Sequence, residues 1–120
     1  MTISLGMITF DTTHAPTLAA WWARQTGGSV HADYGDEFVL VRPSSGTGPI
    51  LAFQQIADPT PGKNRIHLDV SAPDREAEVD RLLGDGATLV ARHEEGGFPW
   101  VVLADPDGNQ FCVAQASDEG

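Results

Sequence analysis

The stretch Asn64-Arg65-Ile66-His67-Leu68-Asp69-Val70 decides the fold expected for this chain, because it places a histidine in the middle of an apolar alternation. Side chains of an extended strand point alternately to two faces. The three aliphatic residues therefore share one face, which indicates contact with a core, while His67 and Asp69 share the other. We predict a strand over residues 65–70 that presents an imidazole and a carboxylate to a pocket.

The residues after this strand predict a helix and three further strands. An apolar stripe predicts a helix over residues 73–83, which Gly84 and Gly86 end. Strands are predicted over residues 88–93, 100–104 and 110–115, and the turn Asp105-Pro-Asp-Gly-Asn109 joins the last two. Residues 94–97 are interpreted as a hairpin tip, with a lid hinge at the Gly-Gly pair as the alternative.

The first half of the chain shows the same order of elements. A strand over residues 3–11 precedes a helix of about three turns, in which Leu18, Trp21 and Trp22 are expected to pack into the core. Strands are then predicted over residues 29–33, 37–42 and 49–55. Residues 44–48 are interpreted as a polar loop and residues 58–62 as a connector rich in proline and glycine.

Shifting the sequence by 60 residues lays Met7 on His67 and Gly48 on Gly108. The repeat is one of element order and hydrophobic pattern, and one such unit needs its partner to close a core. We therefore expect an α+β fold in which one domain spans residues 1–120. It consists of two βαβββ modules, residues 1–57 and 64–116, joined by a linker over residues 58–63.

Composition excludes several classes of partner. The 120 residues include 7 basic and 17 acidic residues, and a net charge of -10 disfavours nucleic acids and anionic membranes. Cys112 is the only cysteine, so no disulfide can form within the chain, and we expect a reducing compartment. No basic leader and no apolar run of membrane-spanning length is present, so a cytoplasmic location is expected.

With these features the sequence resembles the vicinal oxygen chelate superfamily, the group of glyoxalases, bleomycin-resistance proteins and extradiol dioxygenases. The paired βαβββ order, the strand carrying His67 and the closing turn and strand Asp105-Pro-Asp-Gly-Asn-Gln-Phe111 carry the resemblance. The resemblance implies two curved mixed sheets that form a cup, with helices on the outer face. It also implies a homodimer whose copies share their cups.

Members of that superfamily that need a metal take one ligand from the first and one from the last strand of each module. Those positions fall on Met7, Ala52, His67 and Cys112. Alanine has no donor atom, and a thioether is a soft ligand suited to copper(I). We therefore expect no metal cofactor. His67 and Cys112 remain the metal candidates, with a carboxylate from Asp11, Glu37 or Asp69 as a ligand outside the inherited set.

Strand alternation predicts the contents of the cup if His67 points inward. The expected ligand-binding residues are Phe38, Leu40, Arg42, Gln54, His67, Asp69, Trp100, Val102 and Cys112. Arg42 is the expected partner of an anionic ligand group. His67 is the candidate catalytic residue, as a general base or hydrogen-bond donor, and the alternative is a hydrogen-bonded wall residue. The opposite face is expected to contact the helices through Ile8, Phe10, Val39, Val41, Leu51, Phe53, Leu68, Val101, Leu103, Phe111 and Val113.

Two other residue types receive structural interpretations. Cys112, in the middle of a strand, is expected to be a small inert hydrophobe, although a nucleophilic pair with His67 is the alternative. His14, His31 and His93 are interpreted as surface residues.

Three functions remain open on the sequence. The first is binding of a small, partly aromatic molecule in an apolar cup without the family's metal. The second is a metal-dependent lyase, isomerase or dioxygenase that uses His67. The third is a dimeric interaction module with no ligand.

Overall fold

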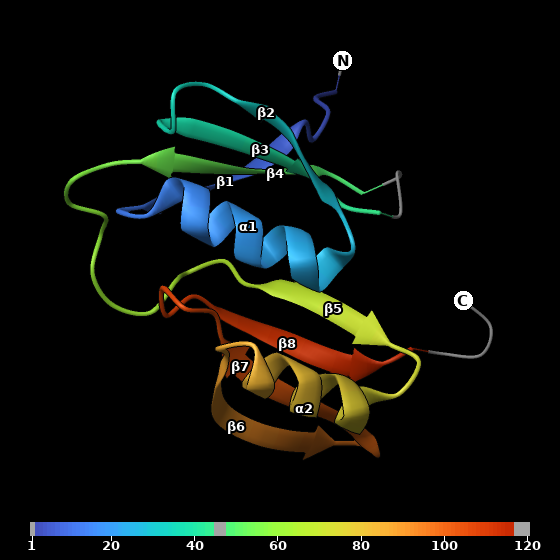
Figure 1. Ribbon diagram of the computed structural model, residues 1–120. Coiled ribbons are helices and arrows are strands. Elements are labelled where there is room, and N and C mark those ends of the chain that lie inside the picture. The colour runs from blue at the N-terminus through green and yellow to red at the C-terminus, as the bar shows by residue number, and fades with distance from the viewer. Residues whose placement is uncertain (1, 45–47, 117–120) are drawn as a thin grey trace. The chain divides into compact units, whose positions relative to one another are not determined.

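The computed structural model describes residues 2–44 and 48–116, and the order strand, helix and three strands occurs twice, as the repeat predicts (Figure 1). The chain divides into two compact units, Met1–Pro61 and Gly62–Gly120. The first contains β1 (Met7–Thr12), α1 (Ala15–Thr26), β2 (Ser29–Asp33), β3 (Phe38–Arg42) and β4 (Ile50–Gln55). The second contains β5 (Leu68–Ala72), α2 (Arg75–Gly84), β6 (Thr88–Glu95), β7 (Phe98–Ala104) and β8 (Gln110–Gln115).

Both units build the same four-stranded mixed sheet. The strand orders are β1-β4-β3-β2 and β5-β8-β7-β6, so the first and last strands of each unit are neighbours. These neighbours pair in parallel, and all other pairs are antiparallel. The predicted α+β class and the two βαβββ modules are confirmed. No helix in the described residues is long and apolar enough to cross a membrane.

The helix-facing side of each sheet carries the core. In the first unit the Phe10 ring stacks on Phe53 at 4.9 Å and approaches Trp22 at 5.8 Å. The predicted core face is confirmed, since its members are buried except for three that are half-buried. The buried members are Val39, Val41, Leu51, Phe53, Val101, Leu103, Phe111 and Val113, and the half-buried ones are Ile8, Phe10 and Leu68.

A glutamine at the end of each last strand fixes the start of each helix. The Gln55 side chain accepts a hydrogen bond from the Ala15 N–H at 2.8 Å and donates one to the Thr13 carbonyl at 2.6 Å. Gln115 accepts from the Arg75 N–H at 2.9 Å and donates to the carbonyl of Pro73. Because the first N–H groups of a helix have no partner within it, these amides satisfy a need of each helix. The two glutamines are 60 residues apart in the chain.

The strand that carries Asp69 begins later than predicted. β5 starts at Leu68, because the Asn64 side chain ties the preceding residues to the start of β8. The Asn64 side-chain amide donates to the carbonyls of Ile66 at 2.7 Å and Gln110 at 3.0 Å. Its oxygen accepts a hydrogen bond from the Gln110 N–H at 2.8 Å. The prediction that Ile66 contacts the core is wrong, since 81% of it is exposed.

Other boundaries also shift for local reasons. β1 starts at Met7, and the residues before it are exposed, Ile3 at 98% and Leu5 at 73%. α2 starts at Arg75 because the Asp74 side chain accepts from the Ala77 N–H at 3.1 Å, as an N-cap does. Of the predicted polar loop over residues 44–48, residues 45–47 lie outside the described part of the chain.

The predicted hairpin tip over residues 94–97 is confirmed, but the strands beside it are longer than predicted. Gly96 and Gly97 have φ values of 60° and 79°, the left-handed pair that a two-residue hairpin turn requires. Glu95 therefore pairs with Phe98, which extends β6 to Glu95 and starts β7 at Phe98.

Candidate small-molecule pocket

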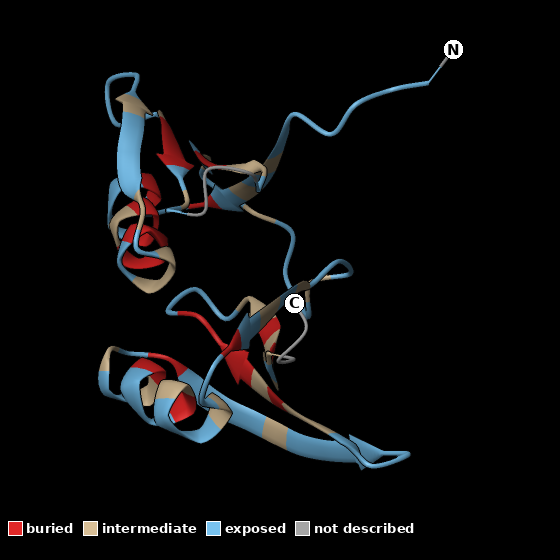
Figure 2. Ribbon diagram, turned by 90° about the vertical axis from the view of Figure 1, so that its right-hand side faces the viewer, coloured by how far each residue is buried: buried red, intermediate tan, exposed pale blue. Residues whose placement is uncertain are grey.

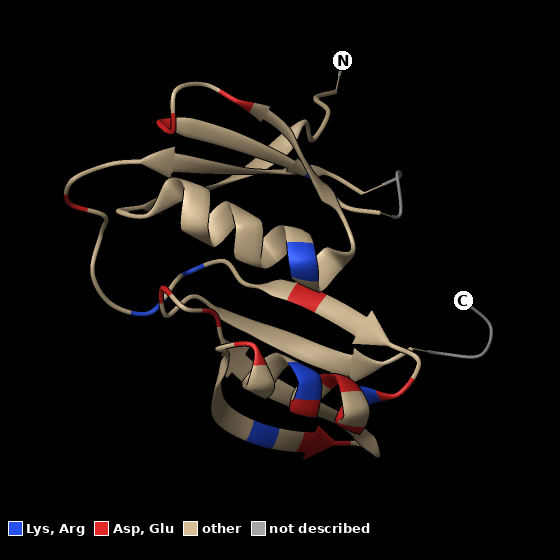
Figure 3. Ribbon diagram, viewed as in Figure 1, with Lys and Arg blue, Asp and Glu red and all other residues tan. Residues whose placement is uncertain are grey.

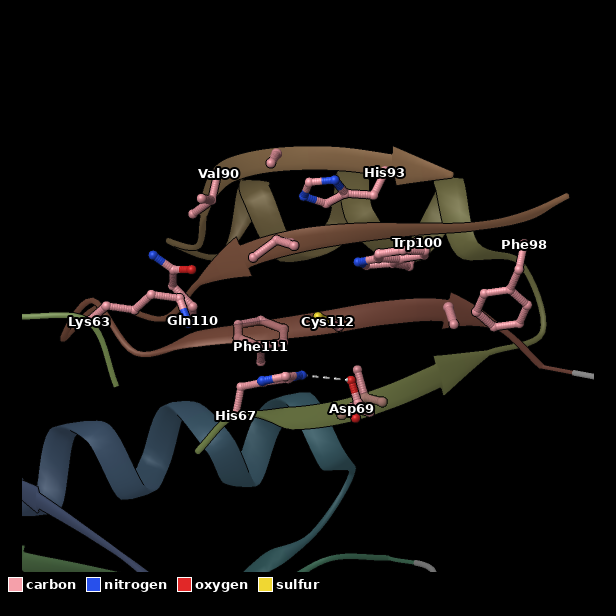
Figure 4. A pocket seen from close by; sticks show the side chains of 14 residues that line it. Lys63, His67, Asp69, Val90, His93, Phe98, Trp100, Gln110, Phe111 and Cys112 are labelled. Atoms are coloured by element: carbon pink, nitrogen blue, oxygen red, sulfur yellow. Dashed lines mark ion pairs between the residues drawn. The ribbon is translucent and has the colours of Figure 1, made fainter. Parts of the chain in front are cut away.

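A pocket of about 620 Å³ lies on the open face of the second sheet (Figure 4). This volume is in the range of pockets that hold small organic molecules. All of its lining residues belong to the second unit. They are Lys63, His67, Asp69, Val70, Val90, Ala91, His93, Phe98, Trp100, Val102, Gln110, Phe111, Cys112 and Ala114.

Strand register arranges the pocket in cross-strand rows. One row contains His93, Trp100 and Ala114, which are successive partners on β6, β7 and β8. The next row contains Val102, Cys112 and Asp69, on β7, β8 and β5. Because residues two apart on a strand share a face, both rows point to the same side of the sheet. The side chains of Ala114, Val102 and Cys112 are small, which leaves room for a ligand beside Trp100.

Three rings form the aromatic wall of the pocket. The His93 ring stacks on Trp100 with centroids 5.3 Å apart and planes 26° from parallel. Phe98 approaches Trp100 at 6.3 Å with a tilt of 40°. His93 is exposed, as expected for a surface residue, but its position in this wall was missed. The Gly-Gly turn was the available signal, since two turn residues place Glu95 opposite Phe98 and therefore His93 opposite Trp100.

His67, Asp69 and Cys112 form a polar cluster on one side of the pocket. His67 Nε2 lies 3.2 Å from Asp69 Oδ1, and the ligand atoms of the three residues lie within 4.8 Å of one another (Figure 4). His67 precedes β5, whereas Asp69 and Cys112 are direct partners on β5 and β8. The cluster thus depends on both the strand pairing and the segment that Asn64 holds.

The surroundings of Cys112 raise the pKa of its thiol and so favour the protonated form. Burial raises the pKa of Cys112, the negative charge of Asp69 raises it further, and so does the hydrogen bond from the thiol to that carboxylate. The positive charge of Lys63 opposes these effects in part. Because the thiolate is the reactive form of cysteine, this environment disfavours a nucleophilic role and agrees with the interpretation of an inert residue.

The predicted site residues of the second module line this pocket together, and those of the first module belong to the first sheet. His67, Asp69, Trp100, Val102 and Cys112 all line the pocket. The remaining four lie on the first sheet, where Phe38 pairs with Gln54, Leu40 pairs with Ala52, and Arg42 pairs with Ser29.

The cation that lines this pocket is Lys63, which the sequence analysis did not single out. Arg42, the cation expected to meet an anionic ligand group, is an exposed residue of the first sheet. No sequence pattern pointed to Lys63, because it precedes the strand and belongs to no alternation.

The inherited metal positions do not fit a divalent ion. Met7 and Ala52 belong to the first unit, and they offer only a weak thioether and no donor atom. The polar cluster of the second unit is a different set, with one nitrogen, one oxygen and one sulfur atom. Three such ligands are the number that a catalytic zinc site uses, with the fourth position open. His67, Asp69 and Cys112 therefore fit a metal that the inherited set does not.

Comparison with known proteins places the fold. The glyoxalase-like domain family matches residues 7–114. A glyoxalase/bleomycin resistance/dioxygenase family enzyme from Burkholderia phytofirmans PsJN is 19% identical, with a TM-score of 0.77 over 96% of this chain and 100% of that one. A superfamily member from Sphaerobacter thermophilus DSM 20745 is 18% identical, with a TM-score of 0.71 over 96% and 98%.

A lactoylglutathione lyase from Agrobacterium tumefaciens is similar at 14% identity and a TM-score of 0.70, over 96% of this chain and 95% of that one. At these identities the likeness concerns the fold alone. No curated protein matches the sequence significantly.

Proposed function

This chain belongs to the glyoxalase-like domain family of the vicinal oxygen chelate superfamily, and we propose that it binds a small, partly aromatic molecule in the second-unit pocket without the family's metal. The fold supports many chemistries, so the pocket and not the fold carries the proposal. The observation that carries it is the aromatic wall, in which His93, Trp100 and Phe98 surround one end of a cavity of about 620 Å³.

The wall suits a flat ring for a physical reason. Aromatic pairs in stacked or tilted arrangements contribute about 0.5–1.5 kcal/mol beyond the burial of their surface. Trp100 is half-buried, and its indole already stacks with the His93 ring, so its orientation is partly fixed before a ligand binds. Small neighbours on the same face, Cys112 and Ala114, leave space for the ring of a ligand.

Titration calorimetry on protein dialysed against a chelator tests this proposal, with a panel of bicyclic aromatic compounds as ligands. We expect saturable binding at one site per chain, and about tenfold weaker binding in Trp100→Leu because stacking is lost. Tyr34→Leu is the matched control, because Tyr34 is an exposed aromatic residue of the first unit. Absence of saturable binding across the panel, or equal affinity in Trp100→Leu, would overturn the proposal.

The polar cluster favours a second candidate function, a metal-dependent lyase, isomerase or dioxygenase. His67, Asp69 and Cys112 would hold the ion, and a divalent ion in such a site polarises a substrate oxygen. Cobalt(II) titration tests this candidate, since a thiolate ligand gives an intense near-ultraviolet absorption. Stoichiometric binding that is lost in His67→Ala, with no such absorption in Cys112→Ala, would establish the metal site and contradict metal-free binding. Metal-dependent turnover that is lost in His67→Ala would then establish the enzyme. No absorption at millimolar cobalt would exclude it.

The proposal extends to the assembly and the location of the protein. We propose that the two modules, residues 1–57 and 64–116, join through residues 58–63 into one cup-forming domain, and that the chain forms a cytoplasmic homodimer. The family resemblance supports the dimer, and the single cysteine supports a reducing compartment. A monomeric mass by sedimentation at micromolar concentration would contradict the dimer. A dimer that binds no ligand would favour the third function, a dimeric interaction module.

A further inference from the structure

The pocket has two chemically different ends. The aromatic wall lies at one end, and Lys63 lies with Gln110 at the other (Figure 4). On β8, Gln110, Cys112 and Ala114 alternate along the same face, so this strand connects the two ends. At about 3.3 Å per residue, the four-residue step from Gln110 to Ala114 spans about 13 Å.

Lys63 brings a positive charge to this pocket in a chain that is strongly acidic overall, with a net charge of -10. In the described part of the chain, its ammonium group makes no ion pair. The contact it does make is a long one, 3.5 Å from Nζ to the carbonyl of Asn64. The charge nevertheless acts across the pocket, because it opposes the rise in the Cys112 pKa. This ammonium is available to an anionic group of a ligand.

Asp69 restricts where such an anionic group can lie. Its carboxylate sits in the row of Cys112, between the two ends, and pairs with His67 at 3.2 Å. A second negative charge near it is disfavoured by Coulomb repulsion. A ligand anion is therefore repelled from the middle of the pocket and attracted to Lys63, which leaves its ring at the aromatic wall. The two charges together define one orientation.

We propose that the ligand is an aromatic anion, with its ring against Trp100 and its carboxylate or sulfonate at Lys63 and the Gln110 amide. This inference rests on the proposed function and adds the charge and the length of the molecule. The lysine side chain bridges part of the 13 Å between the ends, so a ring system of about two fused rings with an attached anionic group matches the remaining distance.

Calorimetry with three naphthalene probes on chelator-dialysed protein tests the inference. We expect 2-naphthoate to bind about tenfold more tightly than the neutral 2-naphthamide, and 2-naphthylmethylammonium to bind more weakly than both. Lys63→Met keeps the aliphatic stem and removes the charge, so it should weaken 2-naphthoate about tenfold and leave 2-naphthamide unchanged. Lys63→Arg should retain the preference for the anion.

Arg65→Met is the matched control, because it removes one positive charge from an exposed residue two positions away that does not line the pocket. We expect no more than a twofold effect on 2-naphthoate. An equal loss of affinity for 2-naphthoate in Arg65→Met and Lys63→Met would overturn the inference, since it would show that any nearby positive charge has the same effect.

The two proposals fail in different ways. Equal binding of all three probes to wild type and Lys63→Met would overturn the aromatic anion while leaving an aromatic pocket in place. Absence of binding by every probe would overturn both.

Discussion

The two units share a scaffold and differ at the positions that carry chemistry. In both, a glutamine at the end of the last strand, Gln55 or Gln115, holds the start of the helix. The positions equivalent to His67, Asp69 and Cys112 in the first unit are occupied by Met7, Thr9 and Ala52, 60 residues earlier. The register agrees, because Thr9 pairs with Ala52 as Asp69 pairs with Cys112. The hydrogen bonds that hold each helix are thus repeated in the two units, whereas the polar cluster of His67, Asp69 and Cys112 has no counterpart at the equivalent first-unit positions.

The helices of the two units also differ in burial and charge. α1 buries both of its tryptophans, Trp21 and Trp22, against the first sheet. α2 buries only Val79 and Leu82, and Figures 2 and 3 show it largely exposed and densely charged. The first unit therefore has the larger aromatic core, and the helix of the second unit is the more exposed and the more highly charged of the two. We infer that residues of the first unit contribute more to stability and residues of the second contribute more to binding.

The largest expected effect concerns two equivalent core positions, Phe53 in β4 and Val113 in β8, both fully buried. Truncation leaves a cavity, so Phe53→Ala should lower the free energy of unfolding by about 3–5 kcal/mol and Val113→Ala by about 2 kcal/mol. Urea unfolding followed by circular dichroism measures both. A larger loss of unfolding free energy in Val113→Ala than in Phe53→Ala would contradict this difference between the units, because it would show that the second unit contributes more to stability.

The paired glutamines should give the next effect. Gln55→Leu and Gln115→Leu each leave a helix N–H and a carbonyl without their partner, which should cost about 1–2 kcal/mol of unfolding free energy. Gln55 is half-buried and Gln115 exposed, so the loss should be larger for Gln55. Gln54→Leu, at an exposed neighbouring position of β4, is the control and should change stability little. Equal stability of all three variants would show that the glutamines do not hold the helices.

The polar cluster predicts a change in thiol reactivity. Asp69→Asn removes the negative charge that raises the Cys112 pKa and weakens the hydrogen-bond acceptor, while burial remains. The pKa should fall, so iodoacetamide at pH 8 should alkylate Cys112 faster by a factor on the order of 3 to 10. Asp58→Asn, an exposed acid of the connector, should leave the rate unchanged. If Cys112 in Asp69→Asn were alkylated no faster than in wild type, the Asp69 carboxylate would not control the reactivity of the thiol.

The smallest effect concerns the charged surface of α2. The hydrogen bond from Arg92, and then that from Arg75, lowers the pKa of Glu76. A lowered folded-state pKa stabilises the protein above the unfolded-state pKa, and this contribution is lost as the pH falls through the folded-state value. Because Glu76 is an exposed residue, Glu76→Gln should lower Tm by only about 1 °C at pH 7 and low salt. Differential scanning fluorimetry at pH 7 and at pH 3 should show a smaller difference at the lower pH.

Periodicity and turn chemistry predicted most of the scaffold. The strands Ser29–Asp33 and Gln110–Gln115 have the predicted bounds, since alternation and flanking turn residues act locally. The predicted strand start before His67 is wrong because the Asn64 side chain bonds to Gln110, far away in sequence. No local pattern reports a contact of that kind.

The pocket was predictable only where strand alternation reaches it. Alternation placed Asp69 beside His67, and the family resemblance added Cys112. Alternation gives no information on residues outside strands, and Lys63 was missed for that reason. His93 was missed because its partner depends on the length of the hairpin turn. The predicted roles of Phe38, Leu40, Arg42 and Gln54 also came from strand alternation, applied to the cup that the family resemblance implies, and they stay predictions.

Amide chemical-shift mapping of ¹⁵N-labelled protein titrated with 2-naphthoate tests whether the small-molecule site belongs to the second unit. We predict saturating shifts at Asp69, Val102 and Cys112 and at the Trp100 indole, with the equivalent first-unit positions Thr9 and Ala52 unchanged. Saturating shifts centred on Thr9, Leu40 and Ala52, or none at Trp100, would contradict it.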